Sequence, residues 1–323
     1  MNERMLTKLF LSVLTTSAAH ALVGCGSGLT CGSEWSYEEE KVSVEDFDAA
    51  VVQADTTGGD ACASFCDETS VGSDGQDISF SYCYSDYDAS DSEAESVTVT
   101  CEYGYLCEGR RPEGLCSDGR KTHGPLLGRH LARAAHMEAA SVSAFRHLAR
   151  ELAAHDAPPE LVGRAKAAAR DEVRHARAMT ALAKQRGAVP EPARVGAMPL
   201  RSLEALALEN AVEGCVGETF AALMAYRQAA HATDPEISST MRTIAEDETR
   251  HAALAYAVSA WVSAKLPIEA RLRVKAARQQ AVSRLLAGCE ASQYAEPVRT
   301  QLGLPLPTES VAMAKGLAAK LWS

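Results

Sequence analysis

Four long segments in the second half of the chain repeat apolar and polar residues with the period of an α-helix. Apolar side chains recur every three or four positions in each segment, so they gather on one face of a helix. The segments are residues 126–154, 159–185, 200–230 and 235–264. This pattern predicts four antiparallel helices packed as a bundle, which is large enough to bury one continuous core.

Weaker patterns fill the rest of the chain. Residues 267–286 are amphipathic at helical spacing, and residues 311–322 predict a short closing helix. Residues 78–84 and 96–105 have the composition of strands and are set among Asp, Ser and Gly. The chain is therefore predicted to be mainly α, with one small module before the bundle. The predicted divisions are 1–24 for a signal, 25–120 for the module or spacer, 121–290 for the bundle and 291–323 for a tail.

The first residues have the pattern of an export signal. Arg4 and Lys8 precede a short apolar run that ends in small residues before Cys25, which is typical of a secretory signal and too short for a membrane span. The Leu-Val-Gly-Cys ending resembles a bacterial lipobox. That resemblance implies a lipid on Cys25, anchoring to a membrane and a place outside the cytoplasm, with the outer membrane favoured over the inner. A plain buried N-terminal helix is the alternative.

Charge changes sign near residue 120. Within the formal net charge of −11, residues 26–120 contribute −18 (22 acidic and 4 basic residues), residues 1–25 contribute +1, and residues 121–323 contribute +6 (20 acidic and 26 basic). The positive excess of the bundle is modest and gives no reason to expect nucleic acid as a partner. The acidic module could dock on the bundle or bind cations, but its Asp clusters lack the EF-hand order. A solvated spacer or small β domain is the simpler interpretation.

Seven of the ten cysteines fall in the acidic module. This density in an exported segment predicts disulfides rather than zinc, because no paired Cys-x2-Cys motifs occur. Seven is an odd number, so one thiol stays free or pairs elsewhere, for example with Cys215 or Cys289, and the connectivity stays open. The seven are Cys31, Cys62, Cys66, Cys83, Cys101, Cys107 and Cys116.

One six-residue phrase, Asp-Glu-x-Arg-His-Ala, occurs in the second predicted helix and again in the fourth. In each copy a Glu and a His three positions apart share one face of the helix, one turn from each other. Each copy also has a Glu upstream: Glu138 lies 34 residues before Glu172. Glu213 lies 35 residues before Glu248. Such an interval fits one helix, a turn and a second helix running back beside it.

A carboxylate in the middle of an apolar helix face is expensive to bury unless positive charge neutralises it. Two divalent cations among four carboxylates and two imidazoles supply that charge, and such ligands with open positions suit iron or manganese. One such Glu is usually a boundary residue and one such His a hydrogen-bonded core residue, but six matched positions favour a metal site. The predicted ligands are Glu138, Glu172, His175, Glu213, Glu248 and His251.

At these residues the chain resembles the ferritin-like di-iron carboxylate superfamily, which takes one Glu from each of two helices and a Glu-x-x-His from each of the other two. The resemblance covers about residues 124–264. It implies a ferritin-like four-helix bundle that holds two metal ions, bridged by the two motif glutamates. It also implies that the Asp and Arg of each motif orient the ligating histidines. These residues are Asp171, Arg174, Asp247 and Arg250.

Two details of the resemblance concern the third helix and the activity. Rubrerythrin-like members carry an extra Glu on the third helix, so Glu218 is a further candidate ligand, although its 30-residue interval to Glu248 breaks the symmetry. Ferritins usually carry a Tyr two turns after the first ligand Glu, where this chain has Phe145. That difference weakens a storage function, and the Asp-Glu-x-Arg-His form of the motif is more similar to that of oxygen-activating monooxygenases and hydroxylases than to that of storage ferritins.

The resemblance therefore implies a di-metal oxidoreductase that activates oxygen or peroxide and oxidises a small or surface-bound substrate, with electrons from an unknown donor. One alternative is a ferroxidase or iron-binding lipoprotein without an organic substrate. Another is an anchored bundle whose metals only stabilise the fold. No Walker loop, dinucleotide-binding glycine motif or Ser-His-Asp set points to a different chemistry.

Overall fold

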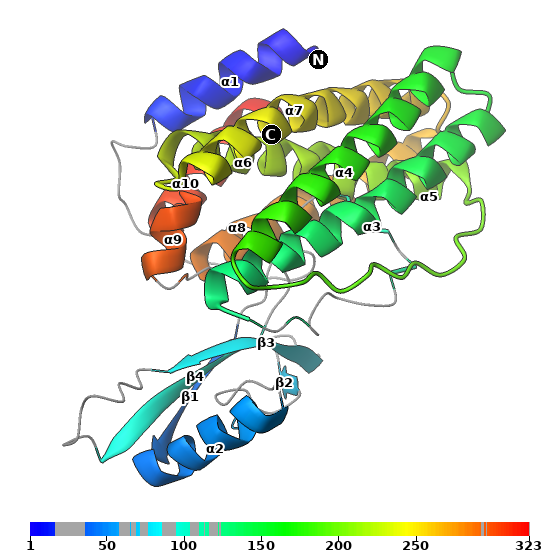
Figure 1. Ribbon diagram of the computed structural model, residues 1–323. Coiled ribbons are helices and arrows are strands. Elements are labelled where there is room, and N and C mark those ends of the chain that lie inside the picture. Colours follow the sequence, from blue (N-terminus) through cyan, green and yellow to red (C-terminus); the bar gives the residue numbers. More distant parts are fainter. Residues whose placement is uncertain are drawn as a thin grey trace.

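The computed structural model describes residues 1–16, 36–57, 65, 69–71, 77–85, 95–103, 110–112, 114, 115, 122, 124–291, 294 and 296–322. These residues are mainly helical, and the predicted four-helix bundle is confirmed. Three of its helices are α3 (Leu126–Ala154), α4 (Pro159–Gln185) and α7 (Pro235–Ser263). The third helix in chain order has three parts, which are α5 (Leu203–Glu209), the π-helix η3 (Asn210–Glu218) and α6 (Thr219–His231). Figure 1 shows α3 beside α4, and α6 beside α7.

Polar caps fix where the last two helices of the bundle begin. Asp234 precedes α7, and its Oδ1 accepts hydrogen bonds from the backbone N–H groups of Glu236 at 2.9 Å and Ile237 at 3.2 Å. Ser202 precedes α5, and its hydroxyl accepts from the N–H of Ala205 at 3.2 Å. Each side chain satisfies N–H groups that have no partner within the helix, so these boundaries follow directly from the local sequence.

Small and medium apolar side chains build the core, because the chain has three Trp and six Phe. Phe145 is the one aromatic residue of the bundle among the largest fully buried side chains. Alanines such as Ala165, Ala168 and Ala245 are also buried. Because alanine has almost no side chain, the helix axes approach closely. The charged residues in the middle of these faces are therefore brought near one another.

Among the described residues after the bundle there are four further helical segments: α8 (Ile268–Ala291), α9 (Glu296–Leu302), α10 (Pro307–Leu317) and the π-helix η4 (Ala318–Trp322). Helices thus occupy both places where the sequence predicts them after the bundle. α8 packs against α5 and η3, and α10 packs against α8. The segment after the bundle therefore covers the face that contains the π-helix.

The first described element is α1 (Glu3–Thr16), which lies against α6, α7 and α10 (Figure 1). Its residues Leu6, Phe10 and Val13 are buried. A Cβ atom at Gly316 would lie 3.0 Å from Val13 Cγ1, so glycine at this point of α10 admits α1. No helix among the described residues has the length and apolar character that a membrane span requires. Cys25 lies outside the described residues, and the lipid anchor stays a prediction.

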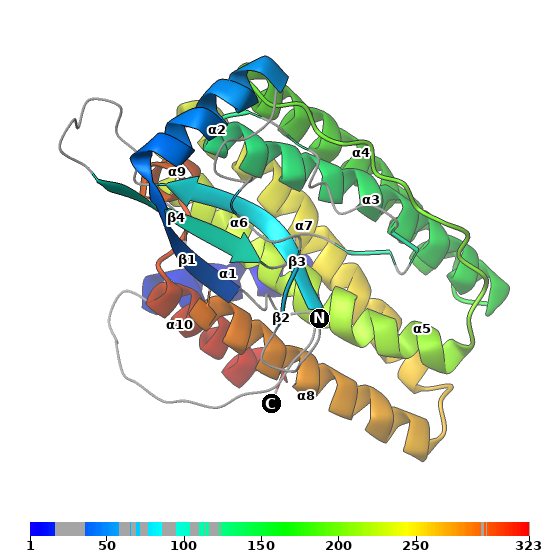
Figure 2. The same ribbon diagram turned by 90° about the horizontal axis from the view of Figure 1, so that it is seen from below.

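The acidic module contains α2 (Val44–Thr57) and the strands β1 (Ser36–Ser43), β2 (Thr69–Val71), β3 (Asp77–Ser85) and β4 (Ser96–Tyr103). The strands form one antiparallel sheet in the order β1-β4-β3-β2 (Figure 2). β3 and β4 lie where the sequence predicts strands, and their register sets Cys83 opposite Cys101. The other cysteines predicted to form disulfides in the module lie outside the described residues. These are Cys31, Cys62, Cys66, Cys107 and Cys116.

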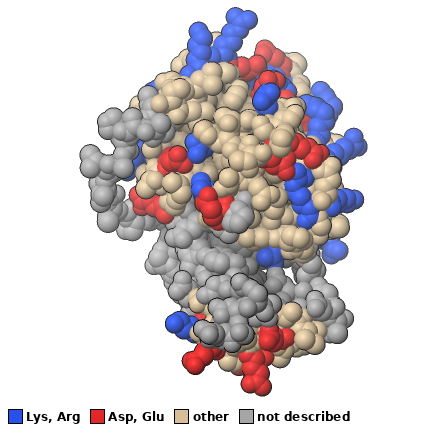
Figure 3. All heavy atoms as spheres, turned by 60° about the vertical axis from the view of Figure 1, so that its left-hand side comes forward, with Lys and Arg blue, Asp and Glu red and all other residues tan. Residues whose placement is uncertain are grey.

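Charged side chains are spread over the face of the molecule that Figure 3 shows. Figure 3 shows basic side chains projecting from the right-hand edge of the helical part. The acidic side chains visible on the strand-bearing part lie at its lower end. Acidic side chains also lie across the helical part in this view, and a basic one lies on the strand-bearing part.

Candidate metal centre

The first group of ligand candidates lies where α3, α4 and α7 meet. It contains Glu138 from α3, Glu172 and His175 from α4, and Glu248 from α7. Each residue offers one ligand atom, and these atoms all lie within 4.8 Å of one another. The Nδ1 atom of His175 is 3.4 Å from Glu138 Oε2 and 3.4 Å from Glu248 Oε1. All four are largely buried, and the side chain of Glu138 is 12% exposed. The group has the spacing that one metal ion needs.

A second group lies beside the first and shares one residue with it. It contains Glu218 from η3 together with Glu248 and His251 from α7, again with ligand atoms within 4.8 Å of one another. The Nδ1 atom of His251 is 3.6 Å from Glu218 Oε2 and 3.4 Å from Glu248 Oε1. Glu218 is fully buried. This group could hold a second ion.

Two carboxylates lie between the two histidines. Glu172 directs Oε2 toward Nδ1 of His175 at 3.7 Å and Oε1 toward Nδ1 of His251 at 3.1 Å. Glu248 Oε1 lies 3.4 Å from both Nδ1 atoms. The centroids of the two imidazole rings are 5.9 Å apart. Carboxylates that face both halves in this way can bridge two ions about 3.5–4 Å apart.

Buried polar atoms in the two groups lack hydrogen-bond partners among the described residues. They include both carboxylate oxygens of Glu172 and of Glu218, and Nδ1 of both histidines. Leaving such atoms unsatisfied is costly, and native proteins rarely do so. All of these atoms face the same space, where cations would satisfy them together. The residues present therefore fit a pair of divalent metal ions.

Charge is shared unevenly within the site. Burial, together with the carboxylate of Glu172, raises the pKa of Glu138 well above its usual range, and burial with Glu248 does the same for Glu218. Burial also acts to raise the pKa values of Glu172 and Glu248, but the two histidines outweigh it and lower both. Without cations, burial thus favours the neutral form of the outer carboxylates, and the two histidines favour the charged form of the central ones. Binding of cations would release protons.

Each histidine is held from behind by an aspartate of the other half. Nε2 of His175 donates to Asp247 Oδ2 at 3.0 Å, and Nε2 of His251 donates to Asp171 Oδ2 at 3.4 Å. These bonds hold a proton on Nε2, so that Nδ1, which faces the carboxylates, is the nitrogen free to bind a cation once it loses its own proton. The geometry is that of a metal ligand supported by a carboxylate.

Two arginines close this arrangement across α4 and α7. Arg174 Nη2 lies 2.7 Å from Asp171 Oδ1 and 2.8 Å from Asp247 Oδ2. Arg250 pairs with the same two aspartates. The aspartates therefore keep their negative charge and a fixed orientation. The resemblance implies that these four residues orient the histidines. The two aspartates contact the histidines directly, and the two arginines contact the aspartates.

On the third helix, the structure places a different residue at the site from the one that spacing predicts. Glu213 lies outside both groups, and its Oε2 accepts a hydrogen bond from the backbone N–H of Arg111 at 3.3 Å. Glu218, the further candidate, lies inside the second group. The spacing argument assumed a regular α-helix, whereas residues 210–218 form a π-helix with a wider turn. This local change of period directs Glu218 toward the site in place of Glu213.

Distant residues hold the π-helix. The carbonyl oxygen of Cys215 accepts hydrogen bonds from Thr219 Oγ1 at 2.9 Å, Tyr256 OH at 3.2 Å and Trp322 Nε1 at 3.0 Å. A Cβ atom at Gly214 would lie 2.8 Å from Ala255 Cβ, so the glycine allows η3 to approach α7 closely. Sequence reasoning missed these residues. Gly214 could have indicated a close approach of another helix. No feature of the sequence around Trp322 indicates its contact with the π-helix.

Arg110 is a second residue that sequence reasoning missed, because it lies in the segment assigned to the module or spacer. Its guanidinium is buried and binds both carboxylate oxygens of Glu209, at 2.7 and 2.6 Å. It also lies 5.6 Å from the centre of the Phe145 ring, whose centroid is 4.8 Å from that of His251. The segment before the bundle thus packs beside the site, where Arg110 is held by Glu209, 99 residues further along the chain.

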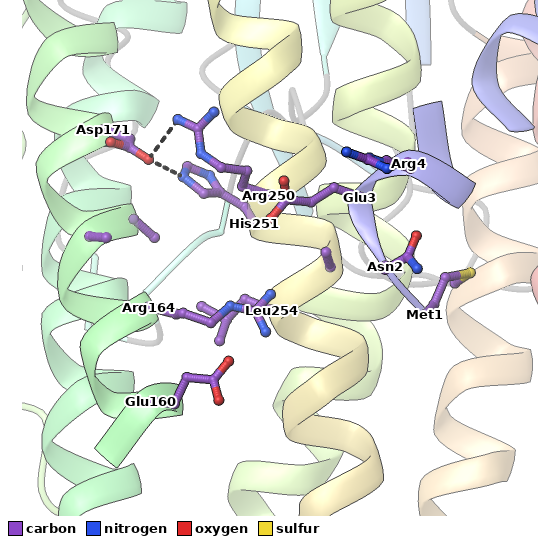
Figure 4. Close-up of a pocket in the computed structure, with 13 residues that line it drawn as sticks. Met1, Asn2, Glu3, Arg4, Glu160, Arg164, Asp171, Arg250, His251 and Leu254 are labelled. Carbon is purple, nitrogen blue, oxygen red and sulfur yellow. Dashed lines mark hydrogen bonds and ion pairs between the residues drawn. The ribbon is translucent and has the colours of Figure 1, made fainter. Parts of the chain in front are cut away.

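A pocket of about 620 Å³ reaches the edge of the site from the surface (Figure 4). Asp171, Arg250 and His251 line its inner side, and residues 1–4, where α1 begins, line the opposite side. Glu160 and Arg164 of α4 complete a wall that mixes charged residues with apolar ones such as Leu254. The pocket gives small polar molecules a path to the aspartate behind His251.

The comparisons with known proteins agree with this geometry. A family model described as Rubrerythrin matches residues 130–259. The matched segment contains every residue of the two ligand groups. Comparison of the chain with curated proteins and with solved structures gives no match. Residues 130–259 therefore form a rubrerythrin-type domain of the ferritin-like di-iron carboxylate superfamily.

Proposed function

We propose that this chain is a di-iron oxidoreductase that uses oxygen or peroxide as its oxidant, with manganese as the alternative metal. The observation that carries the proposal is the pair of histidines that face two shared carboxylates and are braced by aspartates of the opposite half. A site that only stabilises the fold needs the ligands but not the braces. Such braces raise the basicity of the histidines, which tunes the metal for chemistry.

The chain's own residues have distinct tasks in this function. Asp247 and Asp171 hold a proton on Nε2 of the two histidines, and the Phe145 ring packs against His251 and keeps water from that side. Iron bound in the site would supply one-electron redox chemistry and a place for oxygen or peroxide to bind. The residues that would hold the metal pair are Glu138, Glu172, His175, Glu218, Glu248 and His251.

The pocket favours a second candidate function, which is oxidation of iron itself without an organic substrate. On α4 and α7 its lining includes Glu160 and Asp171 beside Arg164 and Arg250, and its apolar side chains there are Leu254 and three alanines. Pockets for organic substrates are usually lined mainly by apolar and aromatic groups. A charged entrance suits a hydrated cation or peroxide better than an apolar molecule.

The test combines metal content with reactivity. Protein expressed in iron-rich medium should hold about two iron atoms per chain, as two ligand groups require. After anaerobic reduction it should consume added oxygen or peroxide, and Glu213→Gln should behave like the unchanged protein. Continued turnover with ferrous iron alone would select the second candidate. A protein that binds two iron atoms but stays reduced in air contradicts both.

We also propose that the chain is exported and anchored through a lipid on Cys25. The pattern of the first 25 residues supports this proposal, whereas the burial of Leu6, Phe10 and Val13 in α1 favours a retained helix. Mass spectrometry of the mature protein distinguishes the two. A diacylated N-terminus at Cys25, lost in Cys25→Ser, supports anchoring. A mature chain that still begins at Met1 rejects it.

A further inference from the structure

A second depression on the surface, of about 480 Å³, lies between α3 and α4. It is distinct from the pocket beside α1 and shares no lining residue with it. Five basic side chains line it around Ala169 and Val173, and among the described residues no acidic side chain does. We call it the basic groove, and its basic residues are Arg146, Lys166, Arg170, Arg174 and Arg177.

The charges of the basic groove are mostly uncompensated. Arg146, Lys166, Arg170 and Arg177 are exposed and form no ion pair within the part of the chain that the structure describes. Elsewhere on the surface, exposed arginines do pair, as Arg273 does with Glu204. Like charges gathered in one concave surface repel one another and attract an anionic partner. The arrangement is therefore better explained by binding than by solubility.

The groove is connected to the metal centre through one residue. The side chain of Arg174 is 54% exposed at the groove and also pairs with Asp247 at 2.8 Å. Asp247 in turn accepts the hydrogen bond from His175 Nε2 at 3.0 Å. A partner in the groove is thus separated from His175 by roughly the thickness of one helix, about 10 Å.

We propose that the basic groove docks an acidic electron-donor protein that reduces the metal pair. This proposal rests on the proposed redox function and identifies the missing donor by its chemistry. Each docking event transfers one electron from the reduced donor, which leaves oxidised, to the metal pair. Two events therefore supply the two electrons that complete the reduction of both ions. Charge attraction speeds such brief encounters without requiring a large interface.

The shape of the groove favours a protein over a lipid surface. Lys166, Arg170, Arg174 and Arg177 run along α4 for about 17 Å, which is longer than one phosphate needs. The groove is concave, and its apolar residues Ala169 and Val173 are not exposed, so it offers no apolar side chain to insert into a bilayer. Anionic membranes are therefore an outcome of the test rather than the proposal.

The first readout is binding, measured by calorimetry with a plant-type ferredoxin as an acidic probe. The triple variant Lys166→Glu/Arg170→Glu/Arg177→Glu leaves every residue of the metal centre in place. The matched control reverses three exposed charges elsewhere, as Arg242→Glu/Arg271→Glu/Lys275→Glu. At low salt the metal-free groove variant should bind ferredoxin at least about tenfold more weakly than the unchanged metal-free protein does. Its affinity should also depend less on salt concentration. The control should bind like the unchanged protein.

The second readout is the rate at which reduced ferredoxin reduces the iron-loaded protein. This rate should fall in the groove variant, while reduction by dithionite and iron content stay unchanged. Equal ferredoxin binding by the groove and control variants overturns the proposal. So does a groove variant that loses binding to phosphatidylglycerol vesicles but not to ferredoxin. If the protein without substitutions binds no iron, the proposed redox function is refuted. The calorimetry needs no iron and still tests the docking surface in that case.

Discussion

The two halves of the bundle carry the same motif but build the site in different ways. In the first half, α3 and α4 are regular helices, and Glu138 lies where the spacing predicts. In the second half, η3 interrupts the helix before α7, and Glu218 takes the place expected for Glu213. The repeated motif thus predicts the ligands on the two helices that contain it. It does not predict which Glu of the neighbouring helix completes each half of the site.

The halves also differ in their surroundings. The side chain of Glu138 is 12% exposed, whereas that of Glu218 is 0% exposed. Segments from outside the matched domain pack around the second half, including Trp322 near the C-terminus and Arg110 before the bundle. Arg110 also lies over the Phe145 ring of α3, so the first half is contacted from outside its two helices as well. In the second half such a contact reaches the π-helix itself, through the carbonyl of Cys215, and offers a way to alter the site without touching a ligand.

The strongest way to break the comparison is to remove a carboxylate that both halves share. Glu248 belongs to both ligand groups and lies 3.4 Å from Nδ1 of each histidine. We expect Glu248→Ala to lower metal content from about two ions per chain to near zero, because neither group keeps enough ligands. Metal analysis measures this, and circular dichroism checks that the helices remain. Retention of one full equivalent would show that the carboxylate serves one half alone.

The next test separates the halves on the third helix. Glu218→Gln should remove about one of two metal ions, because Glu218 belongs only to the second group. Glu213→Gln, made in the same π-helix, should remove none, since Glu213 lies outside both groups. Glu138→Gln should remove the ion of the first half. If Glu213→Gln lowers metal content and Glu218→Gln does not, the spacing prediction holds and the geometry of η3 is different in solution.

Most of the fold and much of the site could be predicted because they depend on local periodicity. Glu172, His175, Glu248 and His251 lie in unbroken helices, where a three-residue interval always returns to the same face. The position of Glu218 depends on a change of helical period, which tertiary contacts support. Trp322 contacts Cys215 from 107 residues away, and no single-helix pattern contains that information.

The aspartate braces give a smaller difference between the halves. Asp247 accepts from His175 at 3.0 Å, and Asp171 accepts from His251 at the longer distance of 3.4 Å. Replacement by Asn keeps the size but removes the charge, and loss of such a partner typically lowers metal affinity or activity about 10–100-fold. We expect Asp247→Asn near the upper end and Asp171→Asn near the lower end, measured by metal titration and oxidant consumption. Equal metal affinity in both variants and the unchanged protein would make the aspartates surface residues.

The smallest expected effect tests whether the C-terminal segment shapes the second half. Trp322→Phe and Tyr256→Phe each remove one donor to the Cys215 carbonyl, which still accepts from Thr219. One such hydrogen bond contributes about 1 kcal/mol, so each variant should bind the second metal ion about fivefold more weakly. Binding of the first ion should not change, and Trp261→Phe on α7 serves as the control.

Stepwise metal titration, followed alongside thermal unfolding, distinguishes positioning from stability. A lower melting temperature with both binding steps intact would mean that Trp322 and Tyr256 stabilise the fold without orienting Glu218. A weaker second step with an unchanged first step would mean that the π-helix transmits their loss to the ligand. The second result is the one expected, because Glu218 lies three residues after Cys215 in the same helix. The asymmetry of the halves would then originate outside the repeated motif.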